Sequence, residues 1–299
     1  MKLGMVGLGR MGGNMAERLR GHGHEVMGWA PHGGGTADSL EELAGQLEPP
    51  RVLWLMVPSG DPTEQNFQQL LGMLERGDVI VDGGNSYFRD SIRRHAEAGE
   101  RGIHFVDAGV SGGIWGLEVG YCIMAGGDEE AIAVVEPAFV ALAPEDGYAH
   151  VGSAGAGHFV KMVHNGIEYG LMQAYAEGFE LMHHSQFDLD LEQIAGIWRY
   201  GSVVRSWLLE LLHAAFEKEG AALEDIAGYV EDSGEGRWTI NEAINAAVPV
   251  PVISAALFAC FASRREINFS AKVAAALRNQ FGGHAVRAVE EAKAGPDPR

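Results

Sequence analysis

The sequence contains little cysteine and has no long hydrophobic run. Its two cysteines, Cys122 and Cys260, do not have the spacing of metal ligands, so neither a disulfide framework nor a zinc site is indicated, and we expect no metal. No apolar run approaches the roughly 18 residues of a membrane-spanning helix. The first twelve residues are interrupted by glycine and carry Arg10, which is not typical of a signal peptide. We therefore expect a cytoplasmic protein with no membrane partner.

Basic residues are also scarce. The 22 Lys and Arg residues stand against 41 Asp and Glu residues, which gives a formal net charge of −19. This charge argues against a nucleic acid or an anionic membrane as a partner. It does not exclude an anionic small molecule, because the local cations of a site decide whether that molecule binds. The length of 299 residues permits one or two domains with a sizeable core.

Glycine is abundant, with 42 residues, and three glycines form a motif near the N-terminus. The motif is G-x-G-x-x-G, and it lies between a predicted strand at 2–6 and a helical pattern. In that context the glycines permit a tight turn and let a pyrophosphate approach the start of the helix. A chance match is the alternative in a glycine-rich chain. We interpret the segment as a dinucleotide-binding turn made by Gly7, Leu8, Gly9, Arg10, Met11 and Gly12.

Strands and helices alternate through the first half of the sequence. Strands are predicted at 2–6, 24–29, 51–57, 78–81, 103–107, 121–125 and 148–151, with helices near 62–75 and 129–141. This alternation predicts a parallel sheet that binds its ligands beyond the carboxyl ends of the strands. Val57, Asn85 and Ser111 lie at three of those ends, where we expect the nicotinamide pocket.

Helical periodicity replaces this alternation after about residue 155. Helices are predicted at 157–184, 191–200, 203–217, 236–247, 251–263 and 268–293. The prediction is therefore an α/β Rossmann domain with a parallel sheet over residues 1–155. An all-α domain is predicted to follow it over residues 156–299.

The segment 155–178 has the pattern on which the functional prediction depends. At 100° per residue it forms one helix with distinct faces. The spacing i, i+3, i+4, i+7 places four polar residues on one face: Lys161, His164, Asn165 and Glu168. An apolar stripe lies on another: Val160, Val163, Ile167, Leu171 and Ala174. Gly166 and Gly170 share a third face, where another segment can approach closely.

Two interpretations of the polar face are open. Lys161 and Glu168 can form a loose ion pair on a solvated face, which is the usual meaning of charges on a helix. Alternatively, a lysine beside a carboxylic acid in a cleft is a base and acid pair whose pKa values the site adjusts. The face carries one residue of each kind instead of repeated Glu and Lys, which favours the second interpretation.

The run Lys-Met-Val-His-Asn-Gly-Ile-Glu-Tyr at 161–169 resembles the catalytic helix of the decarboxylating 6-phosphogluconate dehydrogenase family. The resemblance extends along the whole chain and is closest to the shorter form of the family. It implies oxidative decarboxylation of a sugar-acid phosphate, 6-phosphogluconate, to ribulose 5-phosphate and carbon dioxide, with reduction of NAD or NADP. Lys161 is then the general base, and Glu168 is the acid that protonates C1 of the enediol.

The resemblance also implies further contacts with the substrate. His164 and Asn165 orient its hydroxyl groups, and Tyr169 reaches its phosphate. Three consecutive residues hold the carboxylate, and one residue at a strand end touches both cofactor and sugar: Ser111, Gly112, Gly113 and Asn85. Arg278 and His284 bind the substrate from the neighbouring subunit, which implies a homodimer or a homotetramer.

The chain departs from the family pattern at two positions. Cys260 stands where the family usually has an arginine that contacts the substrate phosphate. Arg264 lies one turn further on the same helix face, so its guanidinium can replace the missing one. Alternatively, the substrate lacks a phosphate, or the substrate binds loosely. At the end of the second strand, Ala30 replaces the acidic residue of NAD-binding relatives, which gives a slight preference for NADP or for use of both cofactors.

Two other functions are compatible with parts of the sequence. A 3-hydroxyisobutyrate-type dehydrogenase shares the Rossmann domain and the lysine, but it oxidises without decarboxylation. Such relatives tend to have Asn-Asn where this chain has His164-Asn165. A non-catalytic dinucleotide sensor is the second alternative, and the presence of both Lys161 and Glu168 argues against it.

Overall fold

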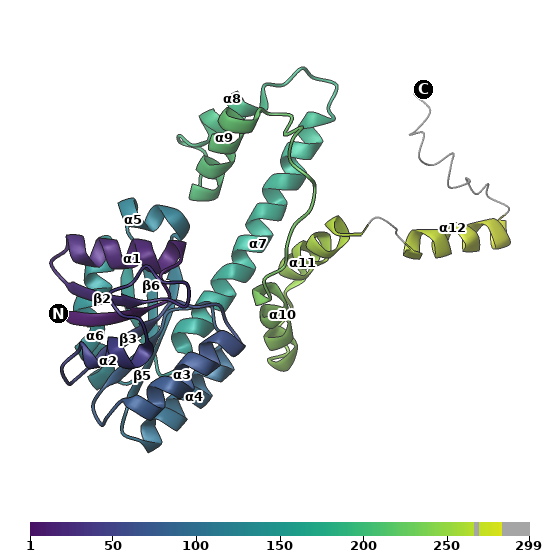
Figure 1. Cartoon of the computed structure of the whole chain (residues 1–299). Helices are drawn as coiled ribbons and strands as arrows, with labels where there is room; N and C mark the ends of the chain where they lie inside the picture. The colour runs from purple at the N-terminus through teal and green to yellow at the C-terminus, as the bar shows by residue number, and fades with distance from the viewer. Residues whose placement is uncertain (266–268, 283–299) are drawn as a thin grey trace. The chain divides into compact units, whose positions relative to one another are not determined.

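The computed structural model describes residues 1–265 and 269–282, and these residues divide into two compact units (Figure 1). The first unit combines residues 1–185 with 233–254, and the second combines 186–232 with the described residues from Ala255 onward. The first unit thus includes a segment of the helical half of the sequence. The boundary after residue 155 remains a prediction.

A seven-stranded sheet forms the centre of the first unit. Its strands lie in the order β2-β1-β3-β4-β5-β6-β7, so the order reverses beside β1. Their bounds are β1 Lys2–Val6, β2 Glu25–Trp29, β3 Val52–Leu55, β4 Val79–Asp82, β5 His104–Ser111, β6 Cys122–Gly126 and β7 Tyr148–Gly152. All seven predicted strands are present, and the prediction of a Rossmann-type sheet is confirmed.

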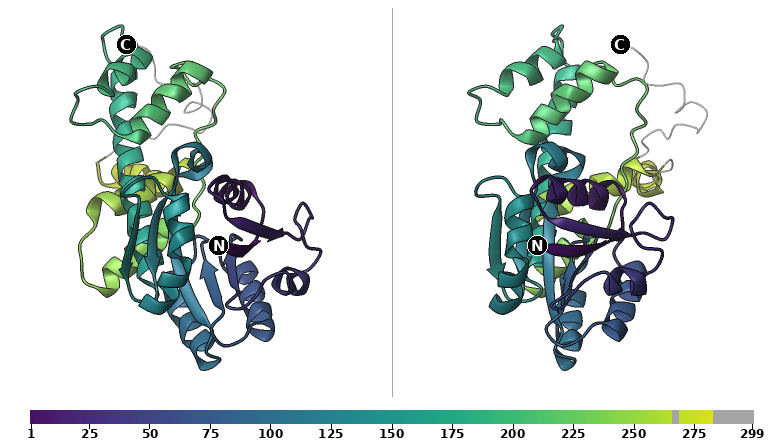
Figure 2. Two further views of the ribbon diagram at one scale, coloured as in Figure 1. Left: turned by 90° about the vertical axis from the view of Figure 1, so that its left-hand side faces the viewer. Right: turned by 60° about the vertical axis from the view of Figure 1, so that its left-hand side comes forward.

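Helices cover both faces of this sheet, as the two views of Figure 2 show. On one face, α1 (Arg10–Gly21) and α6 (Glu129–Leu142) pack on apolar strand residues. The other face is covered by α2 (Leu40–Gly45), α3 (Asp61–Met73) and α4 (Phe88–Glu100). Every residue of β3 is buried, because a strand covered on both faces has no solvent side.

The sheet differs from the prediction in the direction of one neighbouring pair. Strands β1 to β5 are mutually parallel, whereas β6 runs antiparallel to β5 and parallel to β7. The connection from β5 to β6 contains only η1 (Gly113–Trp115) and the single-turn α5 (Gly116–Val119). A parallel crossover needs about a dozen residues or more, so this short link returns the chain in the opposite direction.

The long helix α7 (Ala156–His183) also belongs to the first unit. Its N-terminal part packs on β5, β6 and β7 and beside α4, and α10 (Glu235–Asn245) packs along it. The predicted apolar stripe of α7 does not enter the core, because Ile167 and Leu171 are 53% and 44% exposed. The buried side of the helix instead carries Lys161 and Asn165.

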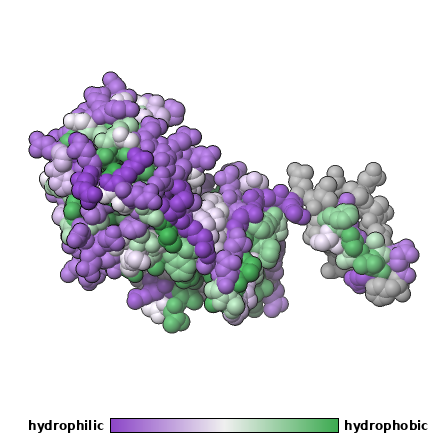
Figure 3. Space-filling view, turned by 90° about the horizontal axis from the view of Figure 1, so that it is seen from below, coloured by the Kyte–Doolittle hydropathy of each residue, from purple (hydrophilic) through white to green (hydrophobic). Residues whose placement is uncertain are grey.

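The second unit is helical in its described part. It contains α8 (Leu191–Trp198), α9 (Trp207–Glu219), most of α11 (Pro251–Ser263) and α12 (Phe269–Gly282), and α8 packs on α9. Hydrophilic residues dominate the face drawn in Figure 3, with smaller apolar areas between them. Within residues 1–265 and 269–282, no helix combines the length and the apolar character needed to cross a membrane.

Candidate active site

The glycine-rich turn lies at the point where the strand order reverses. Gly7 follows β1 and has a φ of 96°, a conformation that favours glycine. A Cβ on Gly12 would lie 2.0 Å from the carbonyl oxygen of Gly7, so only glycine lets α1 start this close to the strand. A Cβ on Gly9 would meet no protein atom within 4 Å. The turn therefore leaves open space beside the start of α1, as a bound pyrophosphate requires.

The other predicted cofactor residues surround this turn. Leu8 packs against Gly28 of β2, Met11 packs on the core, and Arg10 is exposed at the start of α1. Val57 is half-buried just beyond the end of β3, next to β1 in the sheet. Ala30 follows β2 and leads into an exposed loop that contains His32. The residues present fit a dinucleotide, and no carboxylate stands at Ala30 to repel a 2′-phosphate.

The start of α7 is fixed to the sheet by a buried carboxylate. The side chain of Asp107 in β5 accepts hydrogen bonds from the backbone N–H groups of Gly155 at 2.6 Å and His158 at 2.8 Å. Burial raises the pKa of Asp107, and these two donors oppose that effect. A Cβ on Gly157 would lie 2.5 Å from backbone oxygens of Asp107 and Met124, so glycine is needed for this close contact.

Lys161 lies on the buried side of α7, over β5. A Cβ on Gly109 would lie only 2.4 Å from the Cβ of Lys161, so this glycine lets the helix approach the strand. The lysine is 8% exposed. Burial lowers its pKa below the ordinary value of 10.5, and the carboxylates of Glu168 and Glu235 partly oppose that shift. A lysine with a lowered pKa is neutral in a larger fraction of molecules and can accept a proton.

The polar residues of α7 form a connected group around Lys161. His164 Nδ1 lies 3.4 Å from Lys161 Nζ, 3.2 Å from Asn165 Oδ1 and 3.7 Å from Glu168 Oε2. Its other ring nitrogen, Nε2, lies 3.3 Å from the hydroxyl of Ser111 at the end of β5. The structure thus brings together the four polar residues of the helix and the first residue of the Ser-Gly-Gly segment.

The two glycines after Ser111 have backbone conformations that favour glycine. Gly112 has a φ of 133° and Gly113 a φ of 54°. Tyr169 is half-buried on α7, two turns beyond Lys161. Amide groups of such a glycine turn can bind an anionic oxygen, which agrees with a carboxylate site.

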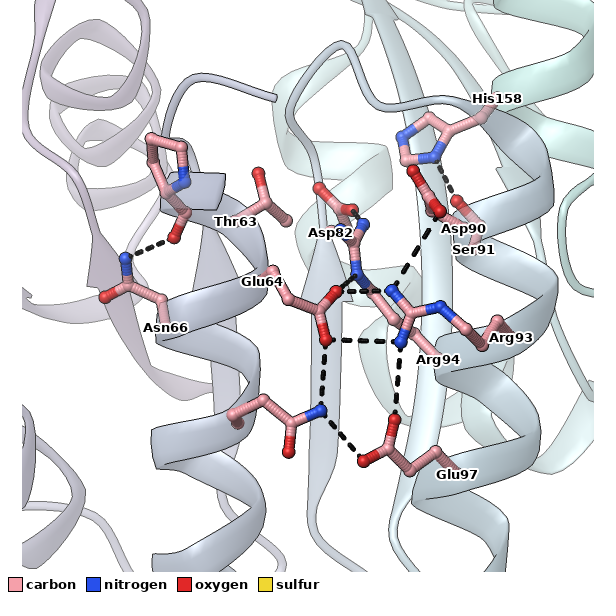
Figure 4. A network of polar contacts seen from close by, with 12 residues as sticks. Thr63, Glu64, Asn66, Asp82, Asp90, Ser91, Arg93, Arg94, Glu97 and His158 are labelled. Atoms are coloured by element: carbon pink, nitrogen blue, oxygen red, sulfur yellow. Dashed lines mark hydrogen bonds and ion pairs between the residues drawn. The ribbon is translucent and has the colours of Figure 1, made fainter. Parts of the chain in front are cut away.

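A network of charged residues lies at the end of β4, three positions before Asn85 (Figure 4). The buried carboxylate of Asp82 accepts a hydrogen bond from the backbone N–H of Gly84 at 3.2 Å. Its other oxygen pairs with the buried guanidinium of Arg94, also at 3.2 Å. Arg94 in turn binds Glu64 at 3.1 Å, and a hydrogen bond from Arg93 lowers the pKa of Glu64 to about 2. This network fixes the turn that presents Asn85.

Glu235 was not predicted from the sequence, and the structure places it beside Asn85 and near enough to Lys161 for its charge to raise the pKa of the lysine. Glu235 is the first residue of α10, is 5% exposed, and accepts a hydrogen bond from the side-chain amide of Asn85. The two residues are 150 positions apart, so no local pattern connects them. The available signal was an acidic residue between two glycines at a helix start, in Ser-Gly-Glu-Gly.

Three further predicted substrate residues lie either in the second unit or outside the described residues. Arg264 lies in the second unit, 3.7 Å from a carboxylate oxygen of Asp232 and over the ring of Phe261. Arg278 is exposed on α12, also in the second unit. His284 lies outside the described residues. The substrate contacts of all three remain predictions.

One group among the described residues has the composition of a metal site. Glu192, His213 and Glu217 have potential ligand atoms within 4.8 Å of one another. They lie in the second unit, on α8 and α9, where His213 Nδ1 is 3.3 Å from Glu217 Oε2. His213 and Glu217 lie one helical turn apart, a spacing that brings side chains together on any helix, and we assign no metal to this group.

Two features define the class of protein: the glycine turn at the reversal of strand order, and the buried lysine on α7. Proteins of this class have a dinucleotide-binding Rossmann domain joined to a helical domain. Residues 2–152 match the family described as the NAD binding domain of 6-phosphogluconate dehydrogenase, and residues 157–294 match its C-terminal domain. The chain belongs to the 6-phosphogluconate dehydrogenase family, which confirms the resemblance seen in the sequence.

Individual relatives agree with this assignment. A Bacillus subtilis protein named provisionally as a 6-phosphogluconate dehydrogenase is 45% identical over 295 residues, or 95% of this chain and 99% of its own. The NAD(+)-dependent, decarboxylating 6-phosphogluconate dehydrogenase of Haloferax volcanii is 45% identical over 297 residues, covering 96% and 98%. Among solved structures, Plasmodium falciparum 6-phosphogluconate dehydrogenase matches with a TM-score of 0.78 and 26% identity, covering 98% of this chain and 68% of that one.

Proposed function

We propose that the protein oxidises and decarboxylates 6-phosphogluconate to ribulose 5-phosphate and carbon dioxide, with reduction of NAD or NADP. The observation that carries this proposal is the buried Lys161, which has a lowered pKa and contacts His164, whose other ring nitrogen lies 3.3 Å from the hydroxyl of Ser111. Full-length similarity to decarboxylating 6-phosphogluconate dehydrogenases supports the same reaction.

Lys161 acts as a base and then as an acid. Its neutral amine takes the proton of the C3 hydroxyl while hydride leaves C3 for the nicotinamide that the cofactor supplies. The ammonium group then donates to the new C3 carbonyl oxygen and stabilises the charge that develops as the C1 carboxylate leaves as carbon dioxide. Glu168 then protonates C1 of the resulting enediol intermediate, which is C2 of the substrate, and ribulose 5-phosphate is formed; the position of Glu168 near His164 on the lysine face supports this role.

The remaining residues orient the substrate. Ser111, with the amides of Gly112 and Gly113, binds the carboxylate, and Asn165 and His164 bind hydroxyl groups. Tyr169 binds the phosphate, with Arg264 in place of the arginine that Cys260 replaces. Cys260 itself is buried, and its Sγ lies 3.3 Å from the carbonyl oxygen of Val230. Selective loss of 6-phosphogluconate use over gluconate in Arg264→Ala would support that replacement.

A homodimer, or a homotetramer built from it, completes the proposal. Arg278 and His284 bind the substrate of the neighbouring subunit. The exposed apolar residues of α7 support an association between chains, because Ile167, Leu171 and Leu181 are 53%, 44% and 75% exposed.

The activity test measures reduction of NAD and of NADP by absorbance, with 6-phosphogluconate and with 3-hydroxyisobutyrate as substrates. We expect turnover with 6-phosphogluconate and release of carbon dioxide, with NADP used at least as well as NAD. Lys161→Met should lower turnover by more than about 10²-fold, the low end for loss of a general base. Lys272→Met on the exposed side of α12 is the matched control. Near-normal turnover of Lys161→Met would overturn the assignment of the base.

A further inference from the structure

The start of α10 is fixed against α7 close to Lys161. The hydroxyl of Thr239 donates to the backbone oxygen of Met162 at 2.9 Å. Thr239 also packs on Gly166, where a Cβ would lie 2.8 Å from its methyl carbon. Gly234 precedes the helix with a φ of 107°, which favours glycine. Because α7 and α10 touch at Met162 and Gly166, the first residue of α10 is placed beside the turn of α7 that carries the lysine.

That first residue, Glu235, is a buried carboxylate with two different oxygens. Its Oε1 accepts a hydrogen bond from Asn85 Nδ2. Its Oε2 is buried and makes no hydrogen bond within the described part of the chain. Burying a carboxylate with one oxygen unpaired costs free energy, so such an arrangement calls for a compensating charge or a functional reason. The buried amine of Lys161 is close enough for its pKa to respond to Glu235.

The hydrogen bond also fixes the direction of the Asn85 amide. A carboxylate oxygen only accepts hydrogen bonds, so the amide must turn its NH₂ group toward Glu235. The carbonyl oxygen of Asn85 then faces away from Glu235 and remains an acceptor. An amide without this partner can rotate and offer either end to a ligand.

We propose that Glu235 is a positioning residue, which orients the Asn85 amide so that its carbonyl oxygen accepts hydrogen bonds from the substrate hydroxyl and the nicotinamide amide. This proposal rests on the proposed function for the substrate, but not for the cofactor. In the same position the negative charge of Glu235 stabilises Lys161 once the lysine has taken its proton. The carboxylate of Glu235 therefore has two roles: it orients the Asn85 amide, and it stabilises the positive charge of Lys161.

A double-mutant cycle tests the orientation. Glu235→Gln keeps the shape of the side chain, but its amide can both donate and accept, so it no longer fixes which end of Asn85 faces it. Asn85→Asp places two carboxylates against each other. The double variant Asn85→Asp/Glu235→Gln restores a donor and acceptor pair with the polarity reversed, keeps the total charge, and still leaves an oxygen of residue 85 facing the ligand. We expect kcat/KM for 6-phosphogluconate to fall about tenfold or more in each single variant. The double variant should recover to within a few-fold of wild type.

The same cycle is measured on the dissociation constant of NADP by fluorescence, which does not depend on the substrate assignment. Glu242→Gln is the control, because Glu242 also joins α10 to α4, through its ion pair with Arg89 at 2.8 Å, and its side chain is 20% exposed instead of buried. It should retain wild-type kinetics. Single effects that simply add in the double variant, in both readouts, would overturn the proposal. The proposal would also be overturned if the loss of kcat/KM and of NADP affinity in each variant simply matched its loss of melting temperature. Wild-type inactivity on 6-phosphogluconate with coupled NADP binding would instead overturn the proposed substrate and leave the Glu235 assignment supported.

Discussion

At the scale of single residues, Lys161 combines a functional requirement with a cost in stability. Its folded-state pKa is lowered because burial disfavours the ammonium form. A group with a depressed pKa contributes its full stability only above the unfolded value, here 10.5, and loses that contribution as pH falls through the folded value. At neutral pH the buried lysine therefore makes the fold less stable than an uncharged side chain of the same length would.

Lys161→Met should accordingly raise the melting temperature near pH 7 while it abolishes turnover. Methionine has a similar length and carries no charge, so it fills the same space without the cost of burying an ammonium group. Thermal unfolding at pH 7 and near pH 10 measures the effect, which should shrink at the higher pH as the lysine of the wild type becomes neutral. Lys272→Met should show no such pattern. A melting temperature lowered equally at both pH values would contradict this account.

At the scale of elements, the contact between α7 and β5 determines how deep the lysine lies. Gly109 and Gly157 occupy the contact, and added side-chain carbons would overlap Lys161 and the backbone of β5 and β6. Interior packing does not absorb such overlap without movement. Lys161 is therefore buried as deeply as it is because Gly109 and Gly157 have no side chains.

Gly109→Ala should shift α7 away from β5 and impair catalysis more than stability. The added methyl overlaps the Cβ of Lys161, so we expect about 1–3 kcal/mol of destabilisation, as for other overpacked sites. The value of kcat should fall by tenfold or more, since small displacements of a base are costly to the reaction. The control is Gly99→Ala on α4, where a Cβ meets nothing within 4 Å. Equal kinetics for both variants would show that the α7–β5 contact does not control the site.

Most helices and strands could be predicted from the sequence, but helix α4, one strand direction and one long-range contact could not. Strands such as β3 were predictable because every residue of the run is apolar and buried. Helix α4 was not predicted, since its buried side includes Ser91 and Arg94 and therefore lacks an apolar period. The antiparallel direction of β6 depends on a short connection, which a strand pattern does not encode. Glu235 was missed because its partner Asn85 is 150 residues away, and the polar face of α7 was found because its members are close in sequence.

At the scale of the whole molecule, the acidic chain offers few cations for an anionic substrate. It has 22 Lys and Arg residues against 41 Asp and Glu residues. Among the predicted substrate residues, Lys161 is buried in the first unit, whereas Arg264 and Arg278 lie in the second. If the proposed dimer supplies Arg278 from the partner, each site depends on two chains.

Mixed dimers should reveal that dependence. Lys161→Met and Arg278→Ala homodimers should each be nearly inactive, because every site lacks either its base or its guanidinium. After subunit exchange, a mixed dimer contains one site with both residues intact, so up to half of the activity of a wild-type dimer should return. Exchange is verified with differently tagged chains, and a mixture of Lys161→Met with Lys161→Met/Arg278→Ala is the control that should stay inactive. Absence of recovery after verified exchange would indicate a site built within one chain.

The hydrogen bond between Asn85 and Glu235 has a consequence for the order in which the site assembles. Lys161 reaches its place once β5 and the start of α7 have met, which joins segments about 50 positions apart and is already possible within the first 185 residues. The Asn85–Glu235 contact closes a loop of 150 residues and needs the chain to return from the second unit. Long loops close with a larger loss of chain entropy and more slowly. We therefore expect Lys161 to reach its final position early in folding. The side-chain amide of Asn85 should be oriented later, when Glu235 arrives beside it.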